Sequence, residues 1–316
     1  MIKEKNPNYK GLWAKYNKYE ILKINNEYYI RPDKKASYEI YDVFDKEKEL
    51  LVDFLLIGRE AMNYADINDA NCDLMSTEKK YQDMILDFVN KYGMFGELTY
   101  RLLNTHIISS GKALTQGYSN IDEMSASTYI KPYFIGIEDI QRIDFDHGVN
   151  EDILKYVYGS DNPNGDLLNN FDKGEDFSIV FSKCYTEKLA NILVMARALY
   201  RIFNSVENCS WTENEDKKAI YQKYANMFNP NNVAFNFDFA DEKTFLNWNF
   251  NSLFQAIELI LAFNETNERK EVKMCKHCFK PFIAKNLNSD YDTASCRNVA
   301  NVYRSRAKNK QAYKSK

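Results

Sequence analysis

Apolar residues recur at intervals of three and four positions in several stretches of this chain, the spacing that places them on one face of a helix. The pattern predicts helices over residues 46–62 and over residues 81–92, the second ending at Gly93. It also predicts the longest buried helix over residues 189–203 and another apolar helix over residues 252–263. The chain is therefore expected to be mainly α.

A different pattern near the start of the chain predicts strands. Aromatic and β-branched residues at positions 19–24 and 27–30 flank Asn25 and Asn26, and asparagine tolerates the positive φ angles of a tight turn. We therefore expect a short N-terminal β-hairpin that ends before Pro32.

Turn-forming residues suggest how the chain is divided. Residues 159–176 are dense in Gly, Asn, Asp and Pro, which favours a linker or a long surface loop. Such a loop would split an acidic, helical body of residues 1–268 into halves 1–158 and 177–268. We expect residues 269–316 to form a separate module.

Charge supports the division at residue 269. Residues 269–316 contain 13 Lys plus Arg against 3 Asp plus Glu, a net charge of +10, whereas the preceding residues have a net charge of −13. A separate basic segment is typical of a part that binds a polyanion such as DNA or RNA. It could equally bind a protein partner or dock on the acidic body of its own chain.

Composition limits the class of protein. The chain has 316 residues, 45% of them hydrophobic, which is enough for a sizeable core. Its first residues lack the apolar stretch of a secretory signal, and no segment approaches the roughly 20 uninterrupted apolar residues that span a bilayer. We expect a cytoplasmic protein with no membrane partner, in which Cys72, Cys184 and Cys209 stay reduced.

The remaining cysteines cluster near the end of the chain. Cys275 and Cys278 are separated by two residues, a spacing at which a tight turn directs two thiolates toward one metal ion. Zn²⁺ prefers four tetrahedral ligands, so a second pair must come from a later turn. There the chain offers Cys296 and, four residues earlier, Asp292.

The same segment resembles the C-terminal zinc ribbon of bacterial CGNR-type proteins over about forty residues. The positions that carry the likeness are Cys275, Cys278, Phe282, Tyr291, Cys296, Asn298, Arg304 and Arg306. The resemblance implies a zinc-ribbon or treble-clef-like fold and a DNA-binding transcription regulator. This chain departs from the family at Asp292, Arg297 and Val299, where the family has Cys, a small residue and Arg.

Because Asp292 stands where the family has Cys, the resemblance does not decide which residue is the fourth metal ligand. Asp can bind Zn²⁺ through oxygen, so we expect Cys275, Cys278, Asp292 and Cys296 to be the metal ligands and zinc to be the cofactor. His277 is the alternative ligand, although it lies inside the turn and would project away from the metal. In a further alternative the ribbon has no metal and is held by a small apolar core. That core would consist of Phe279, Phe282, Ile283 and Tyr291.

After Cys296 the chain is expected to be helical to near its end, with Val299, Val302 and Tyr303 as the inward face. Several basic and polar residues share another face of this helix, and a stripe of this kind fits a phosphate backbone without selecting a sequence. The predicted nucleic-acid-binding residues are Arg297, Asn301, Arg304, Arg306, Lys308 and Lys310. A solvated face, or a latch onto the acidic body, is the alternative.

No convergent set of catalytic groups is visible, so no catalytic residue is predicted and an enzymatic activity stays an open question. Three functions remain. The favoured hypothesis is a nucleic-acid-binding regulatory protein with a C-terminal ribbon. The second is a phage-defence or toxin-like effector whose active site lies in the helical body, and the third is a protein–protein interaction module whose ribbon is purely structural.

Overall fold

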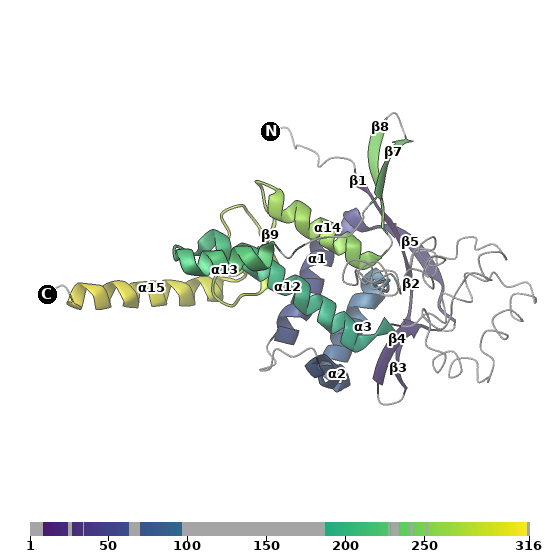
Figure 1. Cartoon of the computed structure of the whole chain (residues 1–316), viewed down its shortest axis with the longest axis horizontal. Helices are drawn as coiled ribbons and strands as arrows, with labels where there is room; N and C mark the ends of the chain where they lie inside the picture. The colour runs from purple at the N-terminus through teal and green to yellow at the C-terminus, as the bar shows by residue number, and fades with distance from the viewer. Residues whose placement is uncertain are drawn as a thin grey trace, which may run out of the picture. The chain divides into compact units, whose positions relative to one another are not determined.

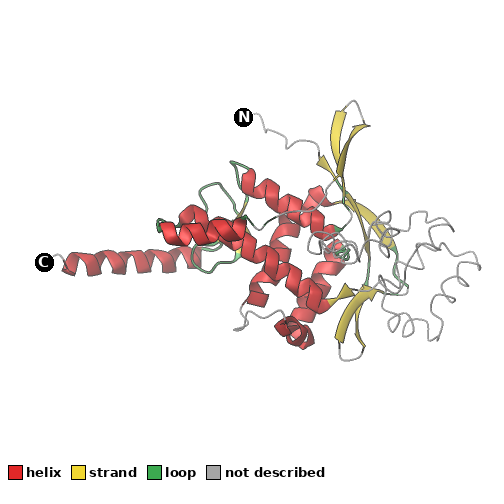
Figure 2. Ribbon diagram, viewed as in Figure 1, coloured by secondary structure: helices red, strands yellow, loops and turns green. Residues whose placement is uncertain are grey.

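The computed structural model describes residues 9–24, 27–33, 35–62, 70–96, 187–226, 228, 234–240, 243–250 and 252–314. In this part of the chain the fold is mainly helical with small β-sheets (Figures 1 and 2). It divides into two compact units. The first contains Met1–Glu47, Tyr64–Met195 and Pro230–Leu259; the second contains Lys48–Asn63, Ala196–Asn229 and Ile260–Lys316.

The described residues form seven α-helices and one 3-10 helix. The helices are η1 (Val43–Lys46), α1 (Glu47–Met62), α2 (Ala70–Thr77), α3 (Lys79–Tyr92), α12 (Leu189–Trp211), α13 (Glu215–Ala225), α14 (Leu253–Thr266) and α15 (Ala294–Lys314). The strands are β1 (Tyr9–Lys10), β2 (Leu12–Tyr16), β3 (Tyr19–Ile24), β4 (Glu27–Pro32), β5 (Tyr38–Asp42), β6 (Glu187–Lys188), β7 (Ala234–Ala240), β8 (Lys243–Asn249), β9 (Val272–Met274) and β10 (Pro281–Ile283). Their sheet orders are β1-β8-β7, β2-β5, β3-β4-β6 and β10-β9.

The four helices predicted within the body are confirmed as α1, α3, α12 and α14. Helix α3 ends as expected at Gly93, which has a φ of 93° and donates its N–H to the carbonyl of Val89 at 2.7 Å. Helix α12 has 23 residues, the longest of the described helices. Its predicted apolar face is buried throughout: Leu189, Ile192, Leu193, Ala196, Leu199, Tyr200 and Phe203.

The predicted N-terminal hairpin is also confirmed, because β3 and β4 pair antiparallel with Tyr19 opposite Pro32. The fold nevertheless contains more strand than predicted. Strand β7 contains Asp238, continues to Ala240 and pairs with β8. Alternating Phe and polar residues in β7 give the period-two pattern of a strand.

Hydrogen bonds between buried polar groups hold the core of the first unit together. The indole N–H of buried Trp13 donates to the carbonyl of Met94 at 3.1 Å. The carboxylate of Glu187, 1% exposed, accepts the backbone N–H groups of Phe95 and Gly96 at 2.9 and 2.6 Å. Because buried carboxylates are costly unless hydrogen-bonded, these contacts fix the chain after α3 against β6.

In the second unit α1 and α12 approach closely at Gly58. A Cβ atom at this position would lie 2.1 Å from the carbonyl oxygen of Ala196 and 2.8 Å from Cβ of Tyr200. Only glycine leaves room for this contact. The close approach places the side chains of α1 and α12 beside the ribbon that follows α14.

Helix α15, drawn in yellow at the C-terminal end in Figure 1, confirms the predicted helix but not its predicted inward face. Val299, Val302 and Tyr303 are 36%, 47% and 61% exposed, so the expectation that they pack inward is wrong. Their spacing makes the helix amphipathic, but no described element of the second unit covers that face. None of the described helices is both long and apolar enough to cross a lipid bilayer.

Several predictions fall on residues outside the described part of the chain. These are the turn-rich segment 159–176 and Cys184. The halves 1–158 and 177–268 and the boundary at residue 269 stay predictions. The described cysteines of the body, Cys72 and Cys209, are free thiols.

Candidate metal centre

The C-terminal cysteines lie in a short two-stranded ribbon. Strands β9 and β10 pair antiparallel, and the turn between them carries Cys275 and Cys278. Two backbone hydrogen bonds of 2.9 Å close this turn, from Phe279 N–H to the carbonyl of Cys275 and from Cys275 N–H to the carbonyl of Lys280. Phe279 has a φ of 59°, a left-handed conformation that costs a residue with a side chain roughly 1–2 kcal/mol.

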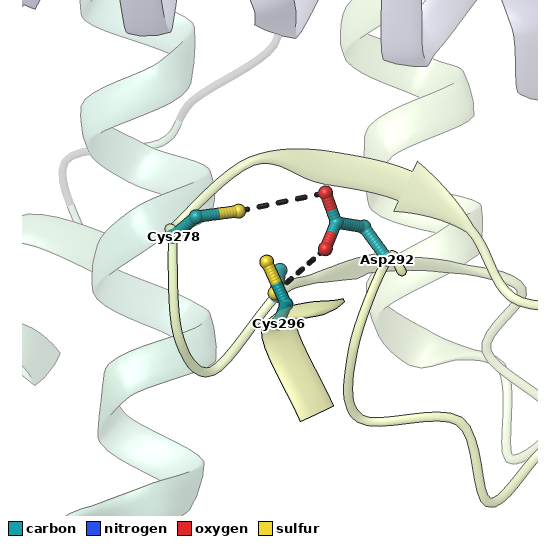
Figure 3. Close-up of side chains that lie close together, drawn as sticks. Cys278, Asp292 and Cys296 are labelled. Atoms are coloured by element: carbon teal, nitrogen blue, oxygen red, sulfur yellow. Dashed lines mark hydrogen bonds between the residues drawn. The ribbon is translucent and has the colours of Figure 1, made fainter. Parts of the chain in front are cut away.

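The structure brings all four predicted metal ligands together. One ligand atom each from Cys275, Cys278, Asp292 and Cys296 lies within 4.8 Å of the other three. The carboxylate of Asp292 accepts hydrogen bonds from the thiols of Cys275 at 3.2 Å and Cys278 at 3.5 Å. Figure 3 shows the thiol of Cys278 pointing at this carboxylate, with Cys296 beside it at the start of a helix.

These four groups lie close enough to hold a metal ion, and the arrangement is compatible with zinc. With bonds of about 2.3 Å to sulfur and about 2.0 Å to oxygen, tetrahedral Zn²⁺ separates a sulfur and an oxygen ligand by roughly 3.5 Å. The observed sulfur–oxygen distances of 3.2 and 3.5 Å are close to this value. His277 is not part of the group, and its ring lies 6.4 Å from that of Tyr303 instead. Of the two candidates for the fourth ligand, Asp292 is therefore the one placed beside the cysteines.

The four residues predicted as an alternative core to the metal are not well buried. Phe279 and Ile283 are 46% and 39% exposed, so the predicted alternative core is wrong for both residues. Phe282 and Tyr291 are only half-buried. Val272 and Met274 of β9 are buried instead. A metal bound by side chains from two turns would cross-link the turn after β9 to the start of α15.

The protonation of the cluster depends on its surroundings. Burial raises the pKa of the Cys278 thiol to about 12, and the hydrogen bond with Asp292 raises the pKa of Cys296. Partial burial opposes ionisation of Asp292, but hydrogen bonds from Cys296, Cys275 and Cys278 outweigh it and lower the pKa of Asp292. A divalent cation lowers the pKa of any thiol that it binds, so metal binding here would release protons.

The start of α15 is fixed next to the cluster. The Thr293 hydroxyl accepts the N–H of Cys296 at 3.2 Å, and the Thr293 carbonyl accepts the N–H of Arg297 at 3.2 Å. Thr293 therefore acts as the N-cap. The positive end of the helix dipole favours the negative charges of Asp292 and a Cys296 thiolate.

Two residues far away in the sequence hold the turn of the ribbon. The guanidinium of Arg59 in α1 donates to the carbonyl of Cys278 at 3.0 Å. The hydroxyl of Tyr200 in α12 donates to the carbonyl of Phe279 at 2.8 Å. No spacing pattern could have identified these residues. Tyr200 lies on a buried helix face that packing alone explains, and Arg59 is a half-buried charged residue within α1.

A buried ion cluster anchors the other side of the ribbon. Lys270 pairs with the carboxylates of Glu207 and Glu265, and Glu207 also accepts the N–H of Met274 at 3.0 Å. Burial raises the pKa of Glu265 to about 7. Burial opposes the charge of Lys270, but the two carboxylates raise its pKa, so the lysine stays charged between them.

The predicted nucleic-acid-binding residues lie along α15. Arg297, Asn301 and Arg304 line one hollow together with the loop before the helix. Arg306 is exposed. Lys308 and Lys310 lie within α15, but their side chains are outside the described part of the structure. Arg304 also donates to the hydroxyl of Tyr291, and its Cζ lies 5.8 Å from that ring.

Comparison of the chain with family models, with curated proteins and with solved structures finds no match. The CGNR-type likeness of the ribbon therefore stays a prediction, and what is shown is the cluster of three cysteines and one aspartate.

Proposed function

We propose that residues 269–316 form a zinc-organised nucleic-acid-binding module. The observation that carries the proposal is the position of the cysteine cluster at the first turn of α15. A metal held there would fix the direction of the basic helix relative to the ribbon. Three thiolates and one carboxylate suit Zn²⁺. The likeness to CGNR-type ribbons leads to the same expectation of a DNA-binding regulator.

The charges on α15 favour a polyanionic partner over a latch onto the chain itself. Arg297, Arg304 and Arg306 are exposed, and none of them pairs with a carboxylate in the described residues. The sequence contains no acidic residue after Asp292. Arginines on one helix that form no ion pair with a carboxylate can contact successive phosphates, which gives salt-dependent binding to DNA or RNA.

The metal is tested by elemental analysis of protein purified without added metal. We expect about one zinc per chain, greatly reduced in Cys275→Ser and Asp292→Ala. Cys209→Ser is the matched control, because this free thiol lies outside the cluster. Protein without bound metal, or with the same metal content in all variants, would show that the cluster is not a zinc site.

Nucleic-acid binding is tested by measuring affinity for DNA and RNA over a series of salt concentrations. Each phosphate contact adds about 0.7 to 0.9 to the slope of log affinity against log salt, so Arg304→Gln and Arg306→Gln are each expected to reduce the slope by about that amount. Lys79→Gln removes an exposed positive charge from α3 and should leave the slope unchanged. Binding that is absent, or equal in all three variants, would refute the proposal.

A further inference from the structure

A polar hollow of about 530 Å³ lies between the loop that follows β10 and the first three turns of α15. Three basic and three amide side chains line it: Lys285, Asn286, Asn288, Arg297, Asn301 and Arg304. The volume is within the roughly 300 to 1,000 Å³ typical of small-molecule sites. The hollow is thus a concave site rather than the flat stripe that helical spacing alone predicts.

The acidic residues in this hollow are already engaged. Asp290 pairs with Lys276 at 3.2 Å, and Asp292 is committed to the cysteine cluster. The charges left to a ligand are therefore positive. Arg304 is held in place through Tyr291, which reduces the rotamer entropy lost when the guanidinium binds an anion.

The amide groups add a second kind of recognition. The side chain of Asn286 is used within the loop, where it accepts the N–H of Asn288 at 3.2 Å and the hydroxyl of Ser289 at 3.1 Å. Asn301 lies one helical turn from both Arg297 and Arg304 on the same face. Its amide can donate and accept at the edge of a base, while the two arginines bind a phosphate.

From this combination we infer that the hollow binds one unpaired nucleotide of a single-stranded nucleic acid. In a duplex the base edges are paired and the bases stacked, so a base enters a hollow only at a cost of a few kcal/mol for unpairing and unstacking, whereas an unpaired base can be turned outward into it at little cost. The half-buried rings of Phe282 and Tyr291 in the wall offer an apolar surface to that base. This inference rests on the proposed function, because it assigns a ligand class to the same basic surface.

The test compares a fluorescent single-stranded 12-mer with a blunt-ended duplex of two annealed 12-mer strands, using the full chain with its metal. A nucleoside monophosphate serves as competitor. We expect the 12-mer to bind more tightly and to be displaced by the monophosphate. Asn301→Leu should weaken binding of the 12-mer about tenfold and weaken binding of the duplex much less. Arg306→Gln, outside the hollow, should weaken both equally.

Equal affinity for the two probes, with no effect of Asn301→Leu, would overturn the inference and leave the proposed function standing. No binding of either probe would overturn both. Because Asn301 is exposed, its replacement should leave the fold intact, and an unchanged metal content of the variant verifies this.

Discussion

The hydroxyl of Tyr200 is expected to control how tightly the cluster binds metal, although Tyr200 supplies no ligand. It donates to the carbonyl of Phe279, the residue in the left-handed conformation within the turn between Cys275 and β10. Tyr200→Phe keeps the buried ring, which is 5% exposed, and removes only this donor. The turn then holds its strained conformation with one contact fewer.

The magnitude follows from that single hydrogen bond. Removing one partner of a buried pair leaves the other unsatisfied and costs about 1–3 kcal/mol. If this energy is lost only in the metal-bound conformation of the turn, 1.4 kcal/mol corresponds to tenfold weaker binding. We therefore expect the apparent dissociation constant for Zn²⁺ to rise about tenfold in Tyr200→Phe.

Competition against a chromophoric chelator of known affinity measures this constant. Tyr303→Phe is the matched control, because the side chain of Tyr303 is 61% exposed, and its affinity should equal that of the wild type. A dissociation constant in Tyr200→Phe within twofold of the wild type, with an unchanged circular dichroism spectrum, would refute the idea that α12 holds the turn for metal.

Three other predictions concern the second unit. Gly58→Ala forces a methyl group against the carbonyl of Ala196 and should lower the free energy of unfolding by about 1–3 kcal/mol, measured by chemical denaturation. An unchanged denaturation midpoint would contradict the close approach of α1 and α12. Phe279→Gly relieves a positive φ at an exposed position and should raise the thermal midpoint of metal-free protein, whereas a lower midpoint would show that the ring contributes packing. Burial raises the pKa of Glu265 to about 7 from 4.5, so the folded state binds the extra proton and this group's contribution to stability falls as pH rises from about 4.5 through 7. Glu265→Gln should remove that fall, which is on the order of 3 kcal/mol because the two pKa values differ by about 2.5, and leave one lysine paired with one carboxylate. Parallel pH–stability curves for wild type and variant would contradict this assignment.

Local periodicity predicted the helices because their apolar faces are packed within the fold. The face of α12 that includes Leu193 and Tyr200 is buried as expected, whereas the equivalent argument failed for Val302 in α15. Spacing shows that a helix has an apolar face but not whether anything covers it. Strand β7 was missed although Phe235 and Phe237 alternate with polar residues, and both are more than half exposed.

The metal cluster was predictable because its ligands lie within 22 residues of one another and two of them have the spacing of a metal-binding turn. Asp292 is preferred to His277 because His277 lies inside the turn and would project away from the metal, and Asp292 is the residue found beside the thiols. The supports of the turn could not be predicted. Arg59 contacts a carbonyl 219 positions later, and because every residue has a backbone carbonyl, the sequence does not indicate which one accepts this hydrogen bond.

The second unit is assembled from three separated stretches of chain, which has a consequence for synthesis on the ribosome. Helix α1 emerges early, but the carbonyl that Arg59 binds is made 219 residues later. At about 5–20 residues per second, α1 waits roughly 10–40 s for its partner. Helix α12, which packs against α1 at Gly58, is made within that interval. Until then the apolar face of α1 is open to chaperones, and a chain released before α12 is made would expose the part of that face that packs on α12, a signal for proteolysis.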